Sequence, residues 1–403
     1  MTTLITLAIG TIILSLIICI HELGHFLAFR KVGIRVMEFS IGFGHKIYGK
    51  EIKGTMFSIR AIPFGGYVMP EGDEDDDGKD NSSTVGLASK PWYIRFFVYF
   101  AGPLMNFLTV IAICFIFNLL SYETMPIISE VKENGAAYEA GLLPGDEIKR
   151  VHYIEIKNYD DILTSLVYNP KEEIPLHFVR DKYKKATLIT PQLFEYEGKT
   201  YGDPGFQLQK RHIPVIRSAG LAFSSLYYLF EDTLAYYKKW IADIVSGKKS
   251  EQDELMGPIG MISETGKAVN DYSEKQKEES KKISEYLYSM SKFVLIEILW
   301  LSFALGFFNI IPIPGLDGGR MLLCLIEGIS RRRFSPNIEG YIVFSGLLFV
   351  LLLIIYGTYN DIRRMIRPSA ETTAIENTNT EKTDDTAKPE EKDKDQRKKN
   401  DEK

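Results

Sequence analysis

Four long apolar stretches dominate the pattern of hydrophobic and polar positions along this 403-residue chain. A helix that crosses a bilayer needs about 20 consecutive, mostly apolar residues, and each stretch approaches that length. Charged segments separate the stretches, so they form individual spans. The pattern predicts an α-helical integral membrane protein with about four transmembrane helices, at residues 1–30, 92–120, 291–320 and 342–360.

The segment after the first span alternates between apolar and polar residues over positions 34–68, and glycines interrupt the alternation. A period of about two residues is typical of β-strands. We therefore predict a membrane-associated β-hairpin or small sheet within residues 31–91. An acidic, solvated loop follows the hairpin near residues 71–78.

The region between the second and third spans has two parts. Residues 121–197 combine short strand-like runs with turn-forming Gly, Pro and Asp, which predicts a small, mainly β domain. Residues 198–290 follow amphipathic helical patterns, typical of helices on a membrane surface. A loop is predicted at 321–341, and a disordered, charged tail at 361–403.

Basic side chains are concentrated in the loop after the first span and in the loop between the third and fourth spans. Such loops face the cytoplasm. Both termini and the 121–290 region are therefore predicted outside the cytoplasm. Arg363, Arg364 and Arg367, which follow the fourth span, argue for the opposite orientation. Four spans place both termini on the same side of the membrane, so the two signals conflict, and we let the first loop decide.

Charge and cysteine usage narrow the function classes. The formal net charge is −5, and topology explains the basic loops, so nucleic-acid binding has no support. Cys19, Cys114 and Cys324 all fall in or beside apolar segments. That placement argues against an extracytoplasmic disulfide framework and favours buried, apolar roles.

The candidate chemistry begins inside the first span, at His21-Glu22-Leu23-Gly24-His25. Residues four apart lie on the same face of an α-helix, so both histidines can reach one metal ion. Glu22 stands where the general base of a zinc hydrolase is found. An ionisable cluster at membrane depth is costly and marks a functional site. The alternative is a chance match at a polar helix end.

A second polar cluster interrupts the third span, where two prolines and three glycines lie between Asn309 and Gly319. Irregular backbone at this depth is tolerated where protein encloses it or where it lines a water-filled cavity. Asp317 lies within this cluster, and alone it would read as a helix cap. Together with His21 and His25 it predicts one zinc ion per chain, with an open fourth position as in catalytic sites.

The second span carries a Gly-Pro pair, Gly102 and Pro103, followed by the polar residue Asn106. The pair permits close packing and a kink. Asn106 either bonds a carbonyl group that the kink frees or orients a ligand. A purely structural role is an equal alternative.

These motifs together resemble the site-2 protease family of intramembrane zinc metalloproteases. The likeness is greatest to its bacterial branch with an extracytoplasmic PDZ domain, the regulators of anti-sigma-factor cleavage (RIP metalloproteases). The resemblance covers nearly everything except the C-terminal tail. It rests on HELGH at 21–25, FSIGFG at 39–44, PFGGYV at 63–68, AGPLMNF at 101–107, GPIG at 257–260 and the segment 309–319.

The resemblance implies a role for each site residue. Glu22 would be the general base, His21, His25 and Asp317 would bind zinc, and Asn309 would hold a substrate carbonyl or the developing oxyanion. The hairpin is similar to a family element that pairs with an extended substrate. The substrate-binding residues would then be Phe64, Gly65, Gly66, Tyr67 and Asn106. The domain at 121–197 resembles one circularly permuted PDZ module.

The function implied is hydrolysis of peptide bonds within the transmembrane segments of single-span proteins, such as anti-sigma factors or signal-peptide remnants. The expected location is the bacterial cytoplasmic (inner) membrane, with the active site toward the cytoplasm. Membrane lipid is expected as a further binding partner. The PDZ domain would bind an extracytoplasmic peptide and help to admit only trimmed substrates. The alternatives are a proteolytically inactive PDZ scaffold and a zinc transporter.

Overall fold

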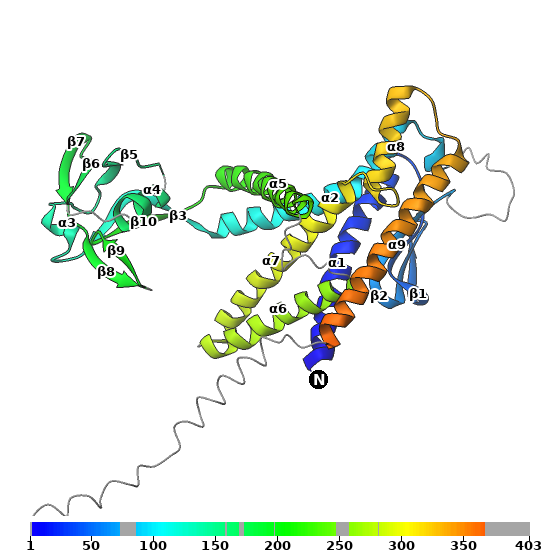
Figure 1. Cartoon of the computed structure of the whole chain (residues 1–403), viewed down its shortest axis with the longest axis horizontal. Helices are drawn as coiled ribbons and strands as arrows, with labels where there is room; N and C mark the ends of the chain where they lie inside the picture. The colour runs from blue at the N-terminus through cyan, green and yellow to red at the C-terminus, as the bar shows by residue number, and fades with distance from the viewer. Residues whose placement is uncertain are drawn as a thin grey trace, which may run out of the picture. The chain divides into compact units, whose positions relative to one another are not determined.

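The computed structural model describes residues 2–72, 86–157, 159–168, 173–196, 198–246, 258–280 and 282–366. Most of the predicted acidic loop and the tail from residue 367 lie outside these residues. The chain divides into two compact units (Figure 1). The first joins Met1–Leu108 with Tyr237–Lys403, the second is Thr109–Tyr236, and each is described by itself.

In the described part of the chain, four helices are long and apolar enough to cross a membrane. The prediction of about four transmembrane helices is confirmed at this level. A proline, Pro103, lies inside the second of them. The four helices are α1 (Thr2–Lys31), α2 (Trp92–Leu120), α7 (Ile283–Ile310) and α9 (Pro336–Ile366).

The third span and the loop after it differ from the prediction. α7 ends at Ile310, so Asp317 lies beyond this helix and not within a span at 291–320. Asp317 opens a separate helix, α8 (Asp317–Ser330), in the segment 321–341 where the pattern predicts a loop. α8 is short and amphipathic, and hydropathy alone does not separate such a helix from a loop.

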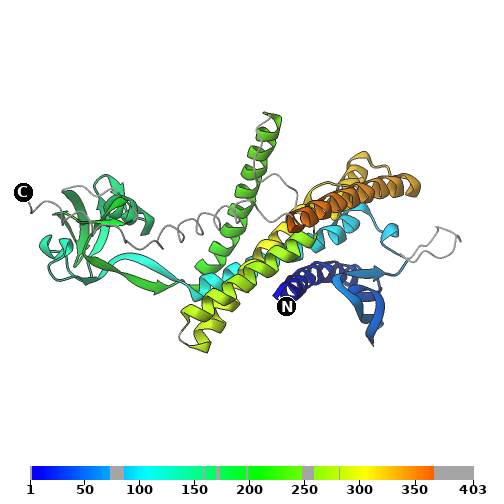
Figure 2. The same ribbon diagram turned by 60° about the horizontal axis from the view of Figure 1, so that its bottom comes forward.

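Small residues bring the helices of the first unit close together. A side chain at Gly24 of α1 would collide with the backbone of Ala101 on α2. A side chain at Gly10 would collide with the backbone of Ile262 on α6 (Pro258–Glu279), which also runs beside α7 (Figure 2). Membrane helices associate through such close contacts because lipid provides no hydrophobic drive between them.

The predicted hairpin is present as two long antiparallel strands, β1 (Val36–Ile52) and β2 (Thr55–Pro70). Gly42 and Gly65 have φ angles of 84° and 85°, in the left-handed region that glycine adopts without strain. These glycines allow each strand to bend. Each strand therefore contributes two segments to the sheet.

The bends give this sheet a free edge. Residues 36–41 pair with residues 56–59 on one side and with residues 66–70 on the other. Residues 56–59 also pair with residues 48–51. Among the described residues, the segment 66–70 pairs on one side only, and we call it the edge segment. A short helix, η1 (Leu87–Ser89), precedes α2.

The second unit contains an antiparallel sheet in the order β10-β3-β4-β6-β7, with β5 on β4. These strands are β3 (Tyr122–Val131), β4 (Glu147–Val151), β5 (Ile154–Glu155), β6 (Ile174–Arg180), β7 (Tyr183–Ile189) and β10 (Phe206–His212). A separate hairpin joins β8 (Gln192–Tyr196) and β9 (Lys199–Asp203). The short helices are α3 (Ala136–Glu139), α4 (Tyr159–Ile162) and η2 (Leu163–Val167).

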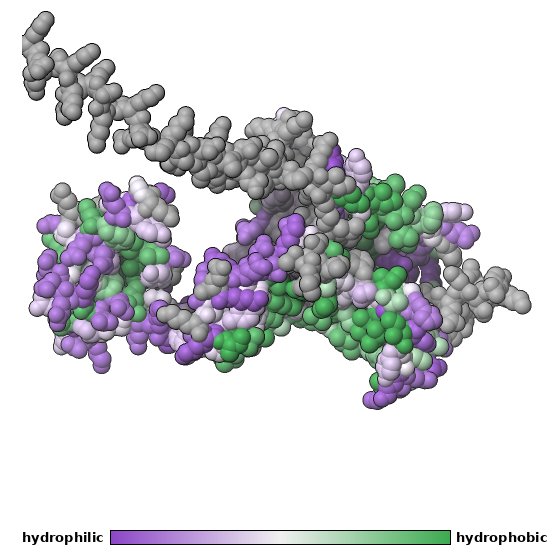
Figure 3. Space-filling model, turned by 90° about the horizontal axis from the view of Figure 1, so that it is seen from below, coloured by the Kyte–Doolittle hydropathy of each residue, from purple (hydrophilic) through white to green (hydrophobic). Residues whose placement is uncertain are grey.

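The core of this β-rich domain is apolar, and Ile148, Leu166, Leu176 and Ile189 are fully buried in it. Its visible surface is mainly hydrophilic, whereas broad hydrophobic patches cover parts of the other unit (Figure 3). The contrast is typical of a chain that combines a water-exposed domain with membrane-crossing helices.

The β-rich domain extends beyond the predicted boundary at residue 197. β9 and β10 occupy the start of the region 198–290, where the pattern predicts helices, and β10 pairs with β3. Helical structure begins with α5 (Val215–Val245). The alternation within β10 is too short to outweigh the helical pattern that follows it. The assignment of this domain to the PDZ fold stays a prediction.

Candidate metal centre and active site

Three side chains from distant parts of the chain converge on one point in the first unit. His21 and His25 lie one turn apart on the same face of α1, as their spacing predicts. Asp317 is the first residue of α8. One potential ligand atom from each residue lies within 4.8 Å of the other two. The structure therefore brings together the three predicted metal ligands.

The turn between α7 and α8 determines where Asp317 lies. Gly315 has a φ angle of 94°, which a residue with a side chain adopts only under strain. At Gly318, an added Cβ would lie 2.6 Å from the carbonyl oxygen of Ile310, and Gly319 is similarly crowded by backbone. The glycines of this motif therefore let the chain fold back on itself and present the aspartate.

The atoms that face one another are Nε2 of each histidine and Oδ2 of Asp317. Oδ2 lies 3.0 Å from His21 Nε2 and 3.2 Å from His25 Nε2, and the two Nε2 atoms are 3.2 Å apart. A tetrahedral zinc ion with bonds of about 2.0–2.1 Å separates its ligand atoms by about 3.3 Å. The triangle therefore fits zinc, with a fourth position for water or substrate.

One face of α2 supports the two imidazole rings. His25 Nδ1 donates a hydrogen bond to the Val98 carbonyl oxygen at 2.9 Å, and Asn106 Nδ2 lies 3.1 Å from His21 Nδ1. A Cβ at Gly102, between these two positions, would lie 2.7 Å from His21 Nε2. Partners of this kind orient metal-binding histidines. The bare backbone at Gly102 makes room for the rings.

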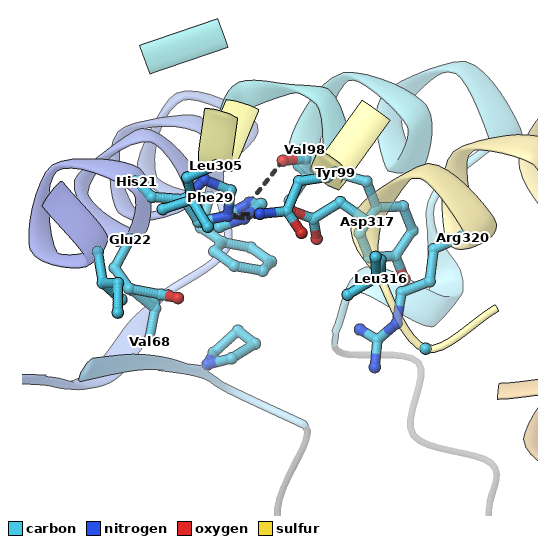
Figure 4. Close-up of a pocket in the computed structure, with 15 residues that line it drawn as sticks. His21, Glu22, Phe29, Val68, Val98, Tyr99, Leu305, Leu316, Asp317 and Arg320 are labelled. Carbon is cyan, nitrogen blue, oxygen red and sulfur yellow. Dashed lines mark hydrogen bonds and ion pairs between the residues drawn. The ribbon is translucent and has the colours of Figure 1, made fainter. Parts of the chain in front are cut away.

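The metal ligands border a cavity of about 400 Å³ (Figure 4). Glu22 and Asn309, the two predicted catalytic residues, line the same cavity. Its size is in the range of sites that bind small ligands. The other lining residues include Val68, Pro70, Tyr99, Leu305 and Arg320.

Glu22 follows His21 on α1 but lies off the triangle of metal ligands. Figure 4 shows it beside Val68 of β2. The Val68 backbone is hydrogen-bonded to the Glu22 carboxylate. Glu22 thus lines the cavity without belonging to the triangle of metal ligands.

The hairpin residues predicted to bind substrate are not among the residues that line the cavity. The cavity-lining residues of β2 are Val68 and Pro70. Which residues of a strand reach a site depends on how the sheet packs against neighbouring helices, and the sequence does not reveal this. β2 also contains the four residues that the resemblance implicates, Phe64, Gly65, Gly66 and Tyr67.

Asn106 is fully buried and is not among the cavity-lining residues. Its contact with His21 favours the orientation of a ligand over the substrate-binding role that the resemblance implies. In the residues that the structure describes, no second group of three potential metal ligands is found.

The model of peptidase family M50 matches residues 9–353 of the chain, a range that contains all three ligands of the triangle. The chain belongs to peptidase family M50. The resemblance to site-2 proteases inferred from the motifs is therefore confirmed. As an M50 member the protein is a metalloprotease, and zinc is its cofactor.

Individual M50 relatives match over most of their length. A Campylobacter jejuni protein named as a candidate zinc metalloprotease is 30% identical, over 88% of this chain and 92% of that protein. A similarly named Fusobacterium nucleatum protein is 31% identical, over 89% and 99%. The regulator of sigma-W protease RasP of Bacillus subtilis is 26% identical, over 88% and 97%.

Proposed function

We propose that this M50 metalloprotease cleaves peptide bonds inside the transmembrane segments of single-span proteins. The observation that carries the proposal is the position of His21 and His25 within the candidate span Leu7–Lys31. A metal centre held there is at membrane depth, and its substrates are segments that reach the same depth. Polar groups are retained at that depth when function requires them.

The proposed reaction divides the work among the residues of the cavity. Bound zinc supplies a Lewis acid that polarises the scissile carbonyl and makes water a better nucleophile. Glu22 takes a proton from the attacking water and passes it to the leaving amine. Asn309 donates a hydrogen bond to the carbonyl oxygen as negative charge develops there, an effect worth about 3–4 kcal/mol in comparable sites.

A transmembrane helix resists this reaction because its own hydrogen bonds satisfy every backbone group. The substrate must therefore unwind locally before its peptide bond can be attacked. The edge segment of the β1–β2 sheet can replace the lost hydrogen bonds by strand addition. Val68 and Pro70 belong to this segment and also line the cavity, which supports substrate pairing beside the metal centre.

The location we propose follows from loop charge and from the relatives. The protein resides in the bacterial inner membrane, with its active site toward the cytoplasm and its β-rich domain and both termini outside. The name of the Bacillus subtilis relative ties that protease to the regulation of a sigma factor. We extend this to substrates that are signalling proteins with one span, such as anti-sigma factors, and to signal-peptide remnants.

Restraint is part of the proposed function, because a protease that cut every membrane helix would be toxic. The β-rich domain, as a PDZ module, would bind an extracytoplasmic peptide. Together with α5 and α6 it would act as a size filter that admits substrates only after their outer domain has been trimmed.

The test compares three samples on a single-span substrate in detergent: the wild type, Glu22→Gln, and the wild type with a zinc chelator. Cleavage by the untreated wild type alone is expected, with equal zinc content in the wild type and Glu22→Gln. Cleavage by Glu22→Gln at the wild-type rate would refute the mechanism. A zinc-loaded wild type that cuts no membrane segment, even one with helix-weakening residues, would favour the inactive scaffold.

A further inference from the structure

A buried ion pair joins α8 to α2, near the end of α8 that lies away from the metal centre. Arg95 of α2 donates a hydrogen bond to the Glu327 carboxylate of α8, and the two side chains are only 5% and 6% exposed. Arg95 Nε is buried with no hydrogen-bond partner among the described residues. Apolar residues of similar volume often stabilise a fold as well as a buried ion pair does. Stability alone is therefore a weak reason for this pair.

One face of α2 serves both the histidines and α8. Residues about three, four or seven positions apart lie on the same face of a helix, and Arg95, Tyr99, Gly102 and Asn106 have this spacing. Gly102 and Asn106 adjoin the two imidazole rings. Arg95 and Tyr99, nearer the start of α2, contact α8. α2 is therefore a common reference for all three metal ligands.

α8 turns one of its own faces toward α2. The guanidinium of Arg320 lies 5.4 Å from the centroid of the Tyr99 ring, and a Cβ at Gly328 would lie 2.7 Å from an atom of the Trp92 ring. Asp317 has the spacing that places it on this same face of α8. A rotation of α8 that separated the ion pair would therefore also move the Asp317 carboxylate.

The ion pair is the directional contact between the two helices. A guanidinium is a rigid, planar fork, whereas a ring surface allows its neighbour to slide. The second oxygen of Glu327, Oε1, accepts a hydrogen bond from the Phe334 backbone amide at 3.2 Å. The other terminal nitrogen of Arg95 lies 3.9 Å from Glu339 Oε2 on α9. Both charged groups are thus held from two sides, which fixes α8 in one rotation and register.

We propose that Arg95 and Glu327 are positioning residues for metal binding. The turn at Gly315 determines where α8 begins, and the ion pair determines how the helix is rotated on α2. Asp317 Oδ2 is thereby placed opposite the two histidine Nε2 atoms. The role of the pair is the geometry of the metal centre rather than the stability of the fold. This inference concerns metal binding and does not depend on the identity of the substrate.

The deciding variant is the double substitution Arg95→Met/Glu327→Met. It leaves no buried charge unpaired, and methionine adapts to irregular space, so the fold should be retained. Zinc affinity is measured in the full chain in detergent, by competition with a chromophoric chelator. We expect binding at least about 10-fold weaker than in the wild type. Thermal unfolding of the metal-free samples should be nearly the same in both proteins.

Cobalt(II) bound in place of zinc gives a second readout, because its visible absorption depends on the number and arrangement of its ligands. The spectrum of the double variant should differ from that of the wild type, since the Asp317 oxygen is displaced. Glu38→Gln is the matched control, because Glu38 is paired with Arg60 in the β1–β2 sheet and does not contact α8. This control should change neither the zinc affinity nor the spectrum.

Glu327→Asp tests the same point while keeping both charges. It shortens the contact by one methylene group, so α8 must shift for the pair to form, and zinc affinity should fall without a matching loss of thermal stability. The proposal is overturned if the double variant binds zinc and cobalt as the wild type does. If the double variant does not fold, the same result with Glu327→Asp overturns it. A loss of affinity that only parallels a loss of thermal stability would also overturn it.

Discussion

At the scale of single residues, Gly102 is the position on which the metal centre depends most directly for space. A methyl group there would lie 2.7 Å from His21 Nε2, inside van der Waals contact. We expect Gly102→Ala to displace an imidazole, to weaken zinc binding at least about 10-fold and to abolish proteolysis. The measurement is the zinc retained after dialysis against increasing chelator.

The matched control is Gly340→Ala in α9, where an added methyl group meets no atom within 4 Å. This variant should retain zinc like the wild type. Equal zinc retention in Gly102→Ala and Gly340→Ala would contradict the conclusion that the two imidazole rings need the space left by the missing side chain at Gly102.

The buried ion pair of the β-rich domain gives a prediction about pH. Burial alone would raise the pKa of Asp146, but hydrogen bonds from Arg180 and from the Leu143 amide outweigh it and lower the pKa. A carboxyl group with a lowered folded pKa stabilises the fold above its unfolded value of about 3.9. That stabilisation is lost as the pH falls through the lower folded pKa.

We therefore expect Asp146→Asn to lower the unfolding free energy of this domain by about 1.5–3 kcal/mol at pH 7. The gap to the wild type should close below about pH 4. Hydrogen exchange of β4 and β6 in the full chain, corrected for intrinsic rates, measures it. Asp160→Asn, at an exposed position, is the control. A gap that stays constant with pH would contradict the assignment.

Which residues the sequence predicts depends on whether their signal is local. His21 and His25 follow from helical spacing, and Asp317 follows from an ionisable group in a broken apolar segment. The support from Val98 and Asn106 does not, because it depends on α1 and α2 lying antiparallel in one particular register. A backbone carbonyl group carries no sequence signature at all.

At the scale of secondary-structure elements, the edge segment leads to a prediction about substrates. In an added strand, every second backbone N–H points toward the edge it joins. Placing one N-methyl group at successive positions of the reacting segment should slow cleavage with a period of two residues. The measurement is the cleavage rate of a series of semisynthetic single-span substrates.

The same methylations outside the reacting segment serve as the control and should leave the rate unchanged. If every N-methyl group within the segment slowed cleavage equally, the result would indicate general steric hindrance and would contradict strand addition.

The requirement for unwinding gives a second prediction at this scale. Replacing the residues around the cut by leucine favours the helical state of the substrate, since leucine is a strong helix former. Cleavage should become slower, and restoring one glycine or proline should recover it. The measurement is the rate of product formation at equal substrate concentration. An unchanged rate for the all-leucine substrate would contradict local unwinding.

The elements that the sequence predicts are those with a strong local signal. The four apolar spans are long runs of apolar residues, and the β1–β2 hairpin alternates over many residues. α8 is amphipathic, but it is only 14 residues long and lies just after the Gly315 turn, so its pattern does not stand out from a loop. The sequence pattern does not reveal β9 and β10, because each strand is short and because the partner of β10, β3, lies far away in the sequence.

At the scale of the whole molecule, the filter role of the β-rich domain is open to test by excision. β10 pairs with β3, and His212 lies opposite Tyr122, so the two ends of the domain adjoin. Replacing residues 122–212 with a short linker removes β3 and β10 together, so neither strand is left without its partner. A deletion of residues 125–193 would remove most of β3 and leave part of β10 without its partner strand.

We expect the excised protein to cleave a substrate whose outer domain is intact at nearly the rate of the trimmed substrate. The wild type should cleave only the trimmed form. Rates on the trimmed substrate and zinc content should be equal in both proteins, which controls for damage to the metal centre. If the excised protein still failed to cleave the intact substrate, the β-rich domain would not be the part of the molecule that excludes such substrates.

The general organisation of the molecule was accessible from hydropathy, since a membrane-crossing part and one compact β-rich domain both leave strong compositional signals. The domain boundary was not, because it depends on pairing between β3 and β10 rather than on composition. The orientation in the membrane rests on loop charge and stays a prediction.

The edge segment has a consequence for how partners are chosen. Backbone amides are the same in every protein. An enzyme that binds its substrate through them is therefore nearly indifferent to the amino-acid sequence of the cleavage site. Its selectivity would be set by how often a membrane helix opens. Aligned cut sites would then share no consensus, while the local opening free energies of their helices would rank them correctly. A mutation that stabilises the transmembrane helix of a membrane protein would therefore also protect that protein from cleavage by this protease.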